Sequence, residues 1–443
     1  MQLERIRIDK LFGRFDYDIP LRRPEKITII HAPNGFGKTV VLNLVNAFFA
    51  GRFGIFFKYQ FRNMMLQFDN LERVEIRKGD SPDLFPQNTK EPQEIEIALE
   101  SSNAVEVNPP FRIDTTTSFP ALNRILPFIE PAGVDIWFDE NIDEYLSTNE
   151  VIARYAAHIP PQVRKGITVP DWLKRITDSS ECRLIETQRL LRIDNQEDPR
   201  RYRRSGATAP KPVVEMEARD LANRIGETLA DYANKSQSLD QSFPNRVIAA
   251  LGSEAAPLAD DVSQRLRTVA QKRSSLIETG LLDKTGVPEI LSQAELIDKQ
   301  VRQVIGVYLD DTEQKFARFD ELFQRVSLFK EIINKKFQFK TIRVAREKGI
   351  SVITTDGREI LLSDLSSGEQ HELVLLYELL FGVKDNALIL IDEPELSLHV
   401  GWQVRFLPDL QRIQKLKPLQ IIMATHSPQI INERWDLAIE LKK

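Results

Sequence analysis

The sequence has a single cysteine, few histidines and no long apolar run, and each scarcity excludes a class of protein. Cys182 is the only cysteine among 443 residues, so neither an internal disulfide nor a cysteine-based metal site can form within one chain. No apolar run reaches the roughly 18 to 20 residues that a membrane-spanning helix needs. The start, MQLERIRIDK, is charged where a signal peptide would be apolar. We therefore expect a cytoplasmic protein without a membrane partner.

The composition is that of a globular protein. Hydrophobic residues make up 42% of the chain and charged residues 28%, so at least one large core can form, and the length allows two or three domains. The formal net charge of −5 argues against general coating of nucleic acid, although it leaves room for a local basic patch. Such a patch has to be located from the positions of basic residues along the chain.

A glycine loop stands between a predicted strand and a predicted helix. KITII (residues 26–30) is typical of a buried parallel strand, and TVVLNLVNAFF (residues 39–49) is typical of a buried helix. Between them, HAPNGFGKTV (residues 31–40) follows the phosphate-loop pattern G-x-x-x-x-G-K-[ST], except that Ala32 replaces the first glycine. Alanine adopts the same turn where φ is negative, so we expect it to be tolerated.

Each residue type in this loop suits one part of a nucleotide. Gly35 and Gly37 let the backbone curl so that successive N–H groups point at phosphate oxygens, next to the positive end of a helix. Lys38 is expected to reach the β- and γ-phosphates, and the hydroxyl of Thr39 to bind Mg²⁺. The loop therefore predicts a nucleotide triphosphate site.

Two adjacent carboxylates follow a second buried strand far along the chain. The apolar run from Ala387 to Ile391 leads directly into Asp392 and Glu393, and Pro394 ends the strand. An acid at this position beside a phosphate loop can hold Mg²⁺, and the next acid can orient or deprotonate the attacking water. We assign the metal to Asp392 and the water to Glu393.

Two further segments supply polar groups. LSSGEQ (residues 365–370) places Ser366 and Gly368 at the start of an amphipathic helix, which makes a second anion site. The buried run IIMAT (residues 421–425) is followed by His426, which is placed to hydrogen-bond a γ-phosphate.

The order A-P-N-G-F-G-K-T, L-S-S-G-E-Q, L-I-D-E-P-E and H-S-P resembles the ABC-type ATPase head of the SMC, RecF and OLD group. In that group two ATP molecules are held between two heads, each by the phosphate loop of one head and the signature loop of the other. The resemblance implies ATP and Mg²⁺ as cofactors. It implies phosphate binding by Asn34, Gly35, Phe36, Gly37, Lys38 and Thr39, metal binding by Thr39 and Asp392, contact in trans from Ser366 and Gly368, and catalysis by Glu393 with His426 as the switch histidine.

The match has one departure and two open positions. Ser367 and Glu369 depart from the pattern L-S-G-G-Q, as is common in the OLD-like branch. The glutamine that reports on Mg²⁺ is left open between Gln60 and Gln67, and the adenine-stacking residue is left open between two aromatic residues, Phe12 and Phe15.

The fold class that follows is α/β: an ABC-type P-loop ATPase head, with a mixed sheet and a flanking antiparallel β subdomain, interrupted by a helical or coiled-coil insertion. Residues 1–210 are expected to form the N-terminal part of the head, residues 211–337 the insertion, and residues 338–443 the C-terminal part. Short alternating runs (VEIRK, EIEIALE, AVEV and FRID) predict the antiparallel sheet between residues 71 and 114.

The insertion is predicted from apolar stripes at helical spacing. Three stripes stand out: Val262, Leu266, Val269 and Leu276; Ile297, Val301, Val304 and Tyr308; and Phe316, Phe319, Phe323, Val326, Ile333 and Phe337. They favour a short hairpin or bundle rather than a long arm. After it, strands are expected to turn at Lys348-Gly349 and Asp356-Gly357.

The resemblance also suggests a partner. Only 17 residues follow His426, too few for the TOPRIM nuclease domain of many OLD-type proteins, and no histidine lies between His158 and His371. We therefore expect an ATPase without nuclease activity of its own, acting as a homo-oligomeric switch and scaffold. The stand-alone OLD-like ATPases of anti-phage systems, PARIS-like or Septu-like, are the nearest group, which implies a separate TOPRIM or HNH nuclease effector and a phage trigger protein.

Two other functions remain open. A RecF-like clamp would grip DNA in an ATP-dependent way, and the run from Arg200 to Arg204 around Tyr202 has a composition able to contact nucleic acid. A transporter subunit is disfavoured by the large insertion. The sequence does not decide whether the chain contacts DNA.

Overall fold

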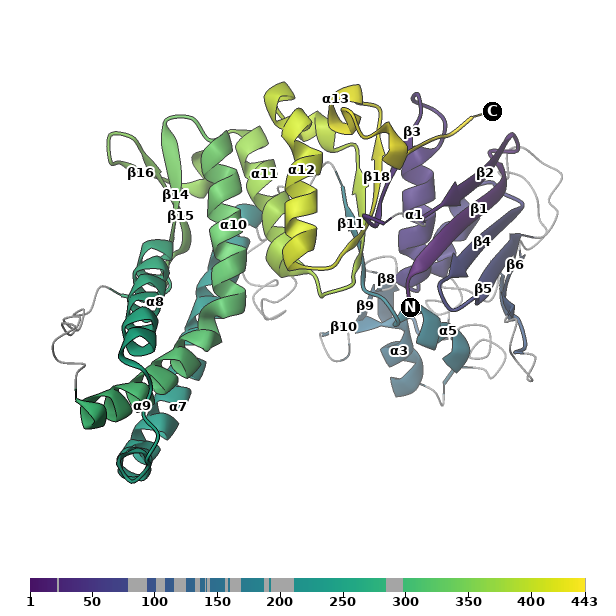
Figure 1. Cartoon of the computed structure of the whole chain (residues 1–443). Coiled ribbons are helices and arrows are strands. Elements are labelled where there is room, and N and C mark those ends of the chain that lie inside the picture. The colour runs from purple at the N-terminus through teal and green to yellow at the C-terminus, as the bar shows by residue number, and fades with distance from the viewer. Residues whose placement is uncertain are drawn as a thin grey trace. The chain divides into compact units, whose positions relative to one another are not determined.

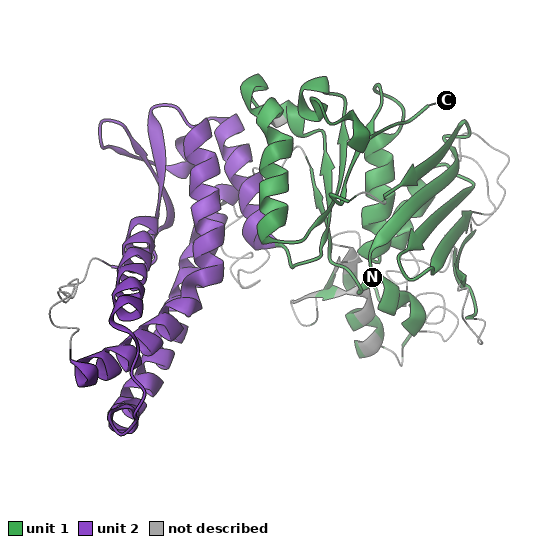
Figure 2. Cartoon of the chain, viewed as in Figure 1, with its two compact units in different colours: residues 1–189, 193–210, 383–443 green, residues 190–192, 211–382 purple. Residues whose placement is uncertain are grey.

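The computed structural model describes residues 1–21, 24–78, 94–100, 108–114, 125–131, 136–139, 141, 144–155, 158–159, 169–186, 191–192, 211–283 and 298–442. The run AVEV (residues 104–107), the arginine-rich run (residues 200–204) and Ile297 lie outside these residues. The chain divides into two compact units, which Figure 2 shows in different colours. Unit 1 contains residues 1–189, 193–210 and 383–443, and unit 2 contains residues 190–192 and 211–382.

A parallel sheet forms one layer of unit 1. Its strand order is β11 (Cys182–Ile185), β17 (Leu388–Asp392), β18 (Gln420–Thr425), β3 (Ile27–His31) and β19 (Ala438–Glu440), and every pairing among them is parallel. The central strands are buried along nearly their whole length, as expected for apolar runs that are covered on both faces. The register places Thr425 beside His31 and Asp392 beside Ala424, so the carboxyl ends of these strands meet at one edge.

An antiparallel sheet forms the second layer of unit 1. Its order is β2 (Phe15–Pro20), β1 (Leu3–Leu11), β4 (Asn63–Phe68), β5 (Arg73–Lys78), β6 (Glu94–Glu100) and β7 (Phe111–Asp114). The predicted strand runs VEIRK, EIEIALE and FRID are thereby confirmed as β5, β6 and β7. Burial alternates along β4 and β5, so one face of the sheet is apolar and buried, and the other is more exposed and mostly polar or charged.

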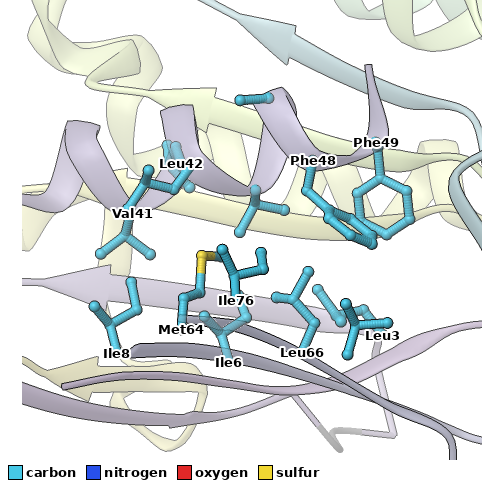
Figure 3. Close-up of a cluster of buried hydrophobic side chains, with 14 of the residues drawn as sticks. Leu3, Ile6, Ile8, Val41, Leu42, Phe48, Phe49, Met64, Leu66 and Ile76 are labelled. Carbon is cyan, nitrogen blue, oxygen red and sulfur yellow. The ribbon is translucent and has the colours of Figure 1, made fainter. Parts of the chain in front are cut away.

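Helix α1 (Lys38–Phe49) packs on the apolar face of this sheet. Figure 3 shows Val41, Leu42, Phe48 and Phe49 of the helix facing apolar side chains of β1, β4 and β5. The helix is buried on most of its circumference, since it also contacts β11, β17 and β18 of the parallel sheet. A helix that is apolar nearly all round belongs inside a domain, and here it fixes the loop that precedes it between two sheets (Figure 1).

Smaller elements complete unit 1. They are η1 (Phe53–Lys58), β8 (Ile129–Pro131), β9 (Ile136–Asp139), β10 (Glu144–Ser147), α3 (Thr148–Arg154), α5 (Asp171–Thr177), η6 (Pro394–Ser397), α12 (Val400–Leu416), α13 (Pro428–Ile431) and η7 (Trp435–Leu437). Strands β8, β9 and β10 form a separate three-stranded sheet with its own core, which includes Trp137 and Val151.

Unit 2 is mostly helical. Helix α7 (Val213–Leu251) has 39 residues and is therefore about 58 Å long at 1.5 Å per residue. The remaining helices are α8 (Ala259–Thr279), α9 (Lys299–Phe316), η3 (Ala317–Phe319), α10 (Asp320–Lys336), η4 (Leu362–Asp364), α11 (Ser367–Tyr377) and the π-helical turn η5 (Glu378–Gly382). The strands are β12 (Leu191–Arg192), β13 (Lys211–Pro212), β14 (Lys340–Ala345), β15 (Gly349–Thr354) and β16 (Glu359–Ile360).

The buried face of α9 matches the expected stripe at Val301, which packs against the core, but not at Tyr308. Tyr308 is 40% exposed, and the buried face runs instead through Ile305 and Leu309, which pack with Val262 of α8. The 3₁₀ turn η3 also divides the longer aromatic stripe between α9 and α10. The apolar residues of α9 allow more than one helical face, and packing against α7 and α8 selects one of them.

The strands after α10 turn where the sequence placed them. β15 begins at Gly349, whose φ is +63°, and Gly357 lies between β15 and β16 with a φ of +86°. A Cβ on Gly349 would come within 1.7 Å of the Ala218 carbonyl oxygen, so α7 and β15 can only approach this closely at glycine. Residues 338–382 share a unit with the helices, although the sequence assigned them to the C-terminal part of the head.

Candidate nucleotide-binding site

The glycine loop connects β3 to α1 at the carboxyl edge of the parallel sheet. Gly35 and Gly37 have φ values of +86° and +78°, a region that other residues rarely adopt. A Cβ on Gly37 would lie 2.9 Å from Leu11 Cδ2, so β1 also restricts this position. Ala32 is fully buried and does not have a positive φ, which explains how the loop accommodates alanine in place of glycine.

Lys38 lies inside the loop. Its side chain is 4% exposed, and its Nζ donates hydrogen bonds to the carbonyl oxygens of Ala32 at 2.8 Å and Pro33 at 3.3 Å. The same Nζ lies 3.9 Å from Glu393 Oε1. The ammonium is therefore anchored to the loop and lies close to a carboxylate.

Aromatic side chains of β2 support the loop. The hydroxyl of Tyr17 donates to the carbonyl oxygen of Phe36 at 2.7 Å, and Phe15 stacks on Phe36 with ring centroids 5.3 Å apart. Phe15 is thus a packing partner of the loop. Tyr17 was not among the residues predicted from the sequence, although the alternation of FDYDIP in β2 places residues 15 and 17 on one face of the sheet.

Phe12 and Gln60 are joined at the edge of the site. The backbone N–H of Phe12 donates to the carbonyl oxygen of Gln60 at 2.8 Å, and Phe12 Cε2 lies 3.1 Å from the point where Gly37 would carry a Cβ. Gln67 lies within β4, paired with Arg5 of β1 and Arg73 of β5. Of the two glutamines, Gln60 is the one attached to the segment that touches the glycine loop.

Thr39 and Asp392 provide two hard oxygen ligands side by side. Thr39 Oγ1 donates to Asp392 Oδ1 at 3.1 Å, from the first turn of α1 to the last residue of β17. Burial raises the pKa of Asp392, and the neighbouring Glu393 carboxylate acts in the same direction, against the hydrogen bond from Thr39. This donor set suits Mg²⁺, which typically takes one or two protein oxygens together with phosphate oxygens and water.

Glu393 stands at a strained turn directly after β17. Its φ and ψ are 42° and 57°, in the left-handed region, and its backbone N–H donates to the carbonyl oxygen of Ala424 at 2.9 Å. Left-handed conformations of non-glycine residues cluster at functional sites. The carboxylate lies between two basic groups, because its Oε1 is 3.9 Å from Lys38 Nζ and 3.8 Å from His426 Nδ1.

His426 is held by a residue that the sequence analysis did not select. Glu395, in η6, has an Oε1 atom 2.9 Å from His426 Nδ1, and the same atom accepts the backbone N–H of His426 at 2.7 Å. The motif D-E-P-E places this acid two residues after Glu393. Its role cannot be read from the motif, because the contact spans 31 positions in the chain.

Ser366 and Gly368 belong to unit 2, at the start of α11. Ser366 caps this helix: its Oγ accepts the backbone N–H of Glu369, and a Glu369 carboxylate oxygen accepts the backbone N–H of Ser366 at 3.0 Å. Lys340 of β14 donates to the same carboxylate at 2.9 Å. Burial acts to raise the pKa of Glu369, but the hydrogen bonds from Lys340 and Ser366 outweigh it, so the pKa is lowered.

The structure therefore brings one set of predicted residues together. Within unit 1, the loop from Asn34 to Thr39, the two carboxylates Asp392 and Glu393, and His426 share one edge of the parallel sheet. The predicted residues Ser366 and Gly368 lie in the other compact unit.

Comparison with known families identifies the class of protein. A model of the AAA_21 family, described as "AAA domain, putative AbiEii toxin, Type IV TA system", matches residues 33–432. This span covers most of the chain and contains all of the motifs described above except Ala32. The chain belongs to this family, and it is a P-loop ATPase of α/β fold with a long helical insertion.

Three solved SMC heads align with this chain over nearly its whole length, at low identity and with TM-scores below 0.5. The head of Pyrococcus furiosus Smc with an extended coiled coil, bound to the C-terminal domain of ScpA, is 12% identical, with 99% of this chain and 94% of that chain covered and a TM-score of 0.33. The SMC head domain from Thermotoga maritima is 11% identical, with 99% and 92% covered and a TM-score of 0.32. A further SmcHead bound to the C-winged helix domain of ScpA is 10% identical, with 97% and 91% covered and a TM-score of 0.34. A comparison with curated proteins gives no match.

None of the described helices has the length and hydropathy to cross a membrane. Among the same described residues, no group of three or more histidine, cysteine, aspartate or glutamate side chains is arranged to hold a metal ion.

Proposed function

We propose that the chain binds ATP with Mg²⁺ at this edge and hydrolyses it slowly, as a conformational switch. The observation that carries the proposal is the convergence of three groups from distant segments: the Lys38 ammonium, the Thr39–Asp392 oxygen pair at 3.1 Å, and the Glu393 carboxylate 3.9 Å from Lys38. These groups correspond to phosphate binding, metal binding and water activation. When bound, Mg²⁺ would supply positive charge to the β- and γ-phosphate oxygens.

The residues divide the hydrolysis between them. Water attacks the γ-phosphorus, the bond from that phosphorus to the bridging oxygen breaks, and ADP and phosphate are the products. Glu393 accepts the proton of the attacking water, and Lys38 stabilises the charge that develops on the phosphoryl group. The strained backbone of Glu393 fixes the direction of its carboxylate, since its N–H is held by Ala424 of β18.

The switch would arise from assembly. In the proposed arrangement each ATP is bound by the glycine loop of one copy and by the helix start at Ser366 and Gly368 of a second copy, so ATP stabilises the closed assembly relative to the open one. Hydrolysis removes the γ-phosphate and with it this difference in binding free energy.

Two substitutions test the ATPase proposal. Glu393→Gln should leave ATP binding intact and abolish turnover, so assemblies larger than the monomer accumulate with ATP and Mg²⁺ in size-exclusion chromatography. Lys38→Ala should lose ATP retention in a filter-binding assay. The exposed Glu433 provides a matched control, and Glu433→Gln should behave as the wild type. Unchanged turnover in Glu393→Gln would remove this residue from its assigned role.

We further propose that the output is the holding and release of a separate nuclease of TOPRIM or HNH type when a phage trigger is present. This proposal rests on the resemblance of the motifs to those of stand-alone OLD-like ATPases. The roles of trigger and effector stay proposals.

A plaque assay tests this output. Cells that carry the chain together with its neighbouring gene should resist phage, and Lys38→Ala should abolish the protection. The purified protein alone should show little affinity for duplex DNA. Tight, salt-dependent and ATP-dependent DNA binding by the chain alone would instead favour a RecF-like clamp.

A further inference from the structure

Glu395 is a buried acid at the centre of the loops that follow β17 and β18. Its side chain is 5% exposed. Its Oε1 accepts the hydroxyl of Thr425 at 2.7 Å and the backbone N–H of His426 at 2.7 Å, and lies 2.9 Å from His426 Nδ1. One carboxylate oxygen therefore fixes the end of β18, the backbone of the switch loop and the imidazole ring.

The contact with the ring determines which nitrogen carries the proton. The carboxylate oxygen that accepts the Thr425 hydroxyl and the backbone N–H of His426 is also placed to accept a hydrogen bond from Nδ1, which would put the ring proton on Nδ1. Nε2 is then the ring nitrogen left for the substrate. Without Glu395 the ring would be free to exchange tautomers and to rotate, since its side chain is 42% exposed.

Further hydrogen bonds surround Glu395. Thr425 is fully buried in β18, and its Oγ1 accepts the backbone N–H of Ser427 at 3.0 Å. Gln403 of α12 donates to the carbonyl oxygen of Glu395 at 3.4 Å, and its Oε1 accepts the hydroxyl of Ser427 at 2.8 Å. Hydrogen bonds from the side chains of Thr425 and Gln403 thus join the turn after β17 to the turn after β18.

We propose that Glu395 is a positioning residue for hydrolysis, which acts through His426. It holds the imidazole with the proton on Nδ1, next to Glu393, so that Nε2 is presented to the γ-phosphate. This assignment rests on the proposed ATPase function and extends it, because it names the group that makes the histidine competent. Glu395 does not touch the nucleotide in this assignment, so ATP affinity should be nearly independent of it.

Steady-state kinetics of three variants test the assignment. Glu395→Ala should lower kcat by roughly ten- to a hundred-fold, as loss of an outer-shell partner typically does, while KM for ATP changes by less than about three-fold. Glu395→Gln keeps an oxygen that accepts all three hydrogen bonds, so it should recover about ten-fold of a hundred-fold loss. The control is Glu433→Ala, which removes an exposed acid near His426 in the sequence and should match the wild type.

A double substitution distinguishes positioning from general damage. If Glu395 acts through the ring, Glu395→Ala combined with His426→Ala should be no slower than His426→Ala alone. Multiplied losses would overturn the proposal, as would a rise in KM that parallels the fall in kcat. A glutamine variant as slow as the alanine variant would also overturn it.

A spectroscopic measurement keeps the test independent of turnover. Nitrogen-15 NMR of the imidazole, assigned through His426→Gln, should show the proton on Nδ1 in the wild type and a mixture of tautomers in Glu395→Ala. If the wild type hydrolyses no ATP, the ATPase proposal fails, and this spectrum still decides whether Glu395 fixes the ring. A wild-type ring with the proton on Nε2 overturns the inference even when the ATPase is active.

Discussion

The backbone of single residues determines the shape of the phosphate loop, and Gly37 is the most constrained of them. Gly37→Ala places a side chain at a φ of +78° and a Cβ 2.9 Å from Leu11 Cδ2. The left-handed conformation costs about 1–2 kcal/mol, and crowding against β1 adds about 1–3 kcal/mol. Urea denaturation should show the sum as a lower free energy of unfolding, together with loss of ATP retention.

Gly51 is the matched control for this strain. It has a φ of +65°, and a Cβ there would meet nothing within 4 Å. Gly51→Ala should therefore show the backbone cost of about 1–2 kcal/mol alone, with ATP retention unchanged. Equal losses in the two variants would show that β1 does not restrict Gly37.

The buried side chain of Tyr17 should make the stability of the protein depend on pH. Burial raises the pKa of Tyr17 from its usual value of 10.0 to about 12. The native state therefore keeps its proton at a pH where the unfolded state loses it, and the stability of the wild type falls as pH rises from about 10 toward 12. By about pH 11 the wild type has lost about 1.4 kcal/mol of its free energy of unfolding through this ionisation.

Tyr17→Phe should show a crossing in urea denaturation. At about pH 8 the variant should be less stable by about 1 kcal/mol, because the carbonyl of Phe36 loses its donor. Near pH 11 the variant should equal or exceed the wild type, since it has no hydroxyl to ionise. A gap that stays constant across this range would contradict the raised pKa.

The sequence identifies some residues of the site and not others, for a physical reason. Lys38, Thr39, Asp392 and Glu393 stand directly beside strand and helix ends that hydrophobic patterns reveal, so their positions follow from local signals. Glu395 holds His426 through contacts that form only after β17 and β18 pair, and no local sequence pattern encodes such contacts.

At the scale of elements, helix α11 is bound to α10 by a buried ion pair. Lys336 Nζ contacts Glu372 Oε1, with the two side chains 2% and 0% exposed. Lys336→Met leaves a buried carboxylate without this ammonium, which should lower the free energy of unfolding by about 3–5 kcal/mol. Lys336→Met combined with Glu372→Leu should cost less than Lys336→Met alone, because an apolar pair of similar volume removes the uncompensated charge.

Urea denaturation of the two single variants and the double variant checks this pair. Losses that add in the double variant would show that the charges do not compensate each other. The matched pair for comparison is Lys335 with Glu331, which are 54% and 44% exposed. Lys335→Met should change the free energy of unfolding by less than about 1 kcal/mol.

Elements also show where hydrophobic patterns suffice. The buried strands β3, β17 and β18 and helix α1 lie where their apolar runs predicted them, because both faces of these elements are covered. The predicted face of α9 was right at Val301, which packs against the buried cluster, and wrong at Tyr308, which is exposed while Ile305 and Leu309 are buried. An amphipathic stripe fixes the existence of a helix more firmly than its rotation.

At the scale of the whole molecule, the residues that we propose to bind the nucleotide are divided between the two compact units. Unit 1 contains the glycine loop, the two carboxylates and the histidine, and unit 2 contains Ser366 and Gly368. The sequence indicated that all these motifs serve one function, because together they resemble a single kind of ATPase. Their assignment to units depends on packing: β14, β15 and α11 contact the helices α7 and α10.

A mixing experiment tests whether the active site is shared between two copies. Lys38→Ala should disable the glycine loop, and Ser366→Arg should disable the helix start, so each variant alone should be inactive as an ATPase. In a dimer that contains one copy of each, the intact loop of the Ser366→Arg copy meets the intact helix start of the Lys38→Ala copy, and one of the two sites is complete. An equal mixture should therefore recover about a quarter of the wild-type rate, because about half of the dimers are mixed and each has one working site. A mixture as inactive as its components would mean that both halves must come from one chain, and trans contact by Ser366 would be wrong. Mixing Lys38→Ala with the Lys38→Ala, Ser366→Arg double variant provides the control, since no combination of these copies contains an intact glycine loop.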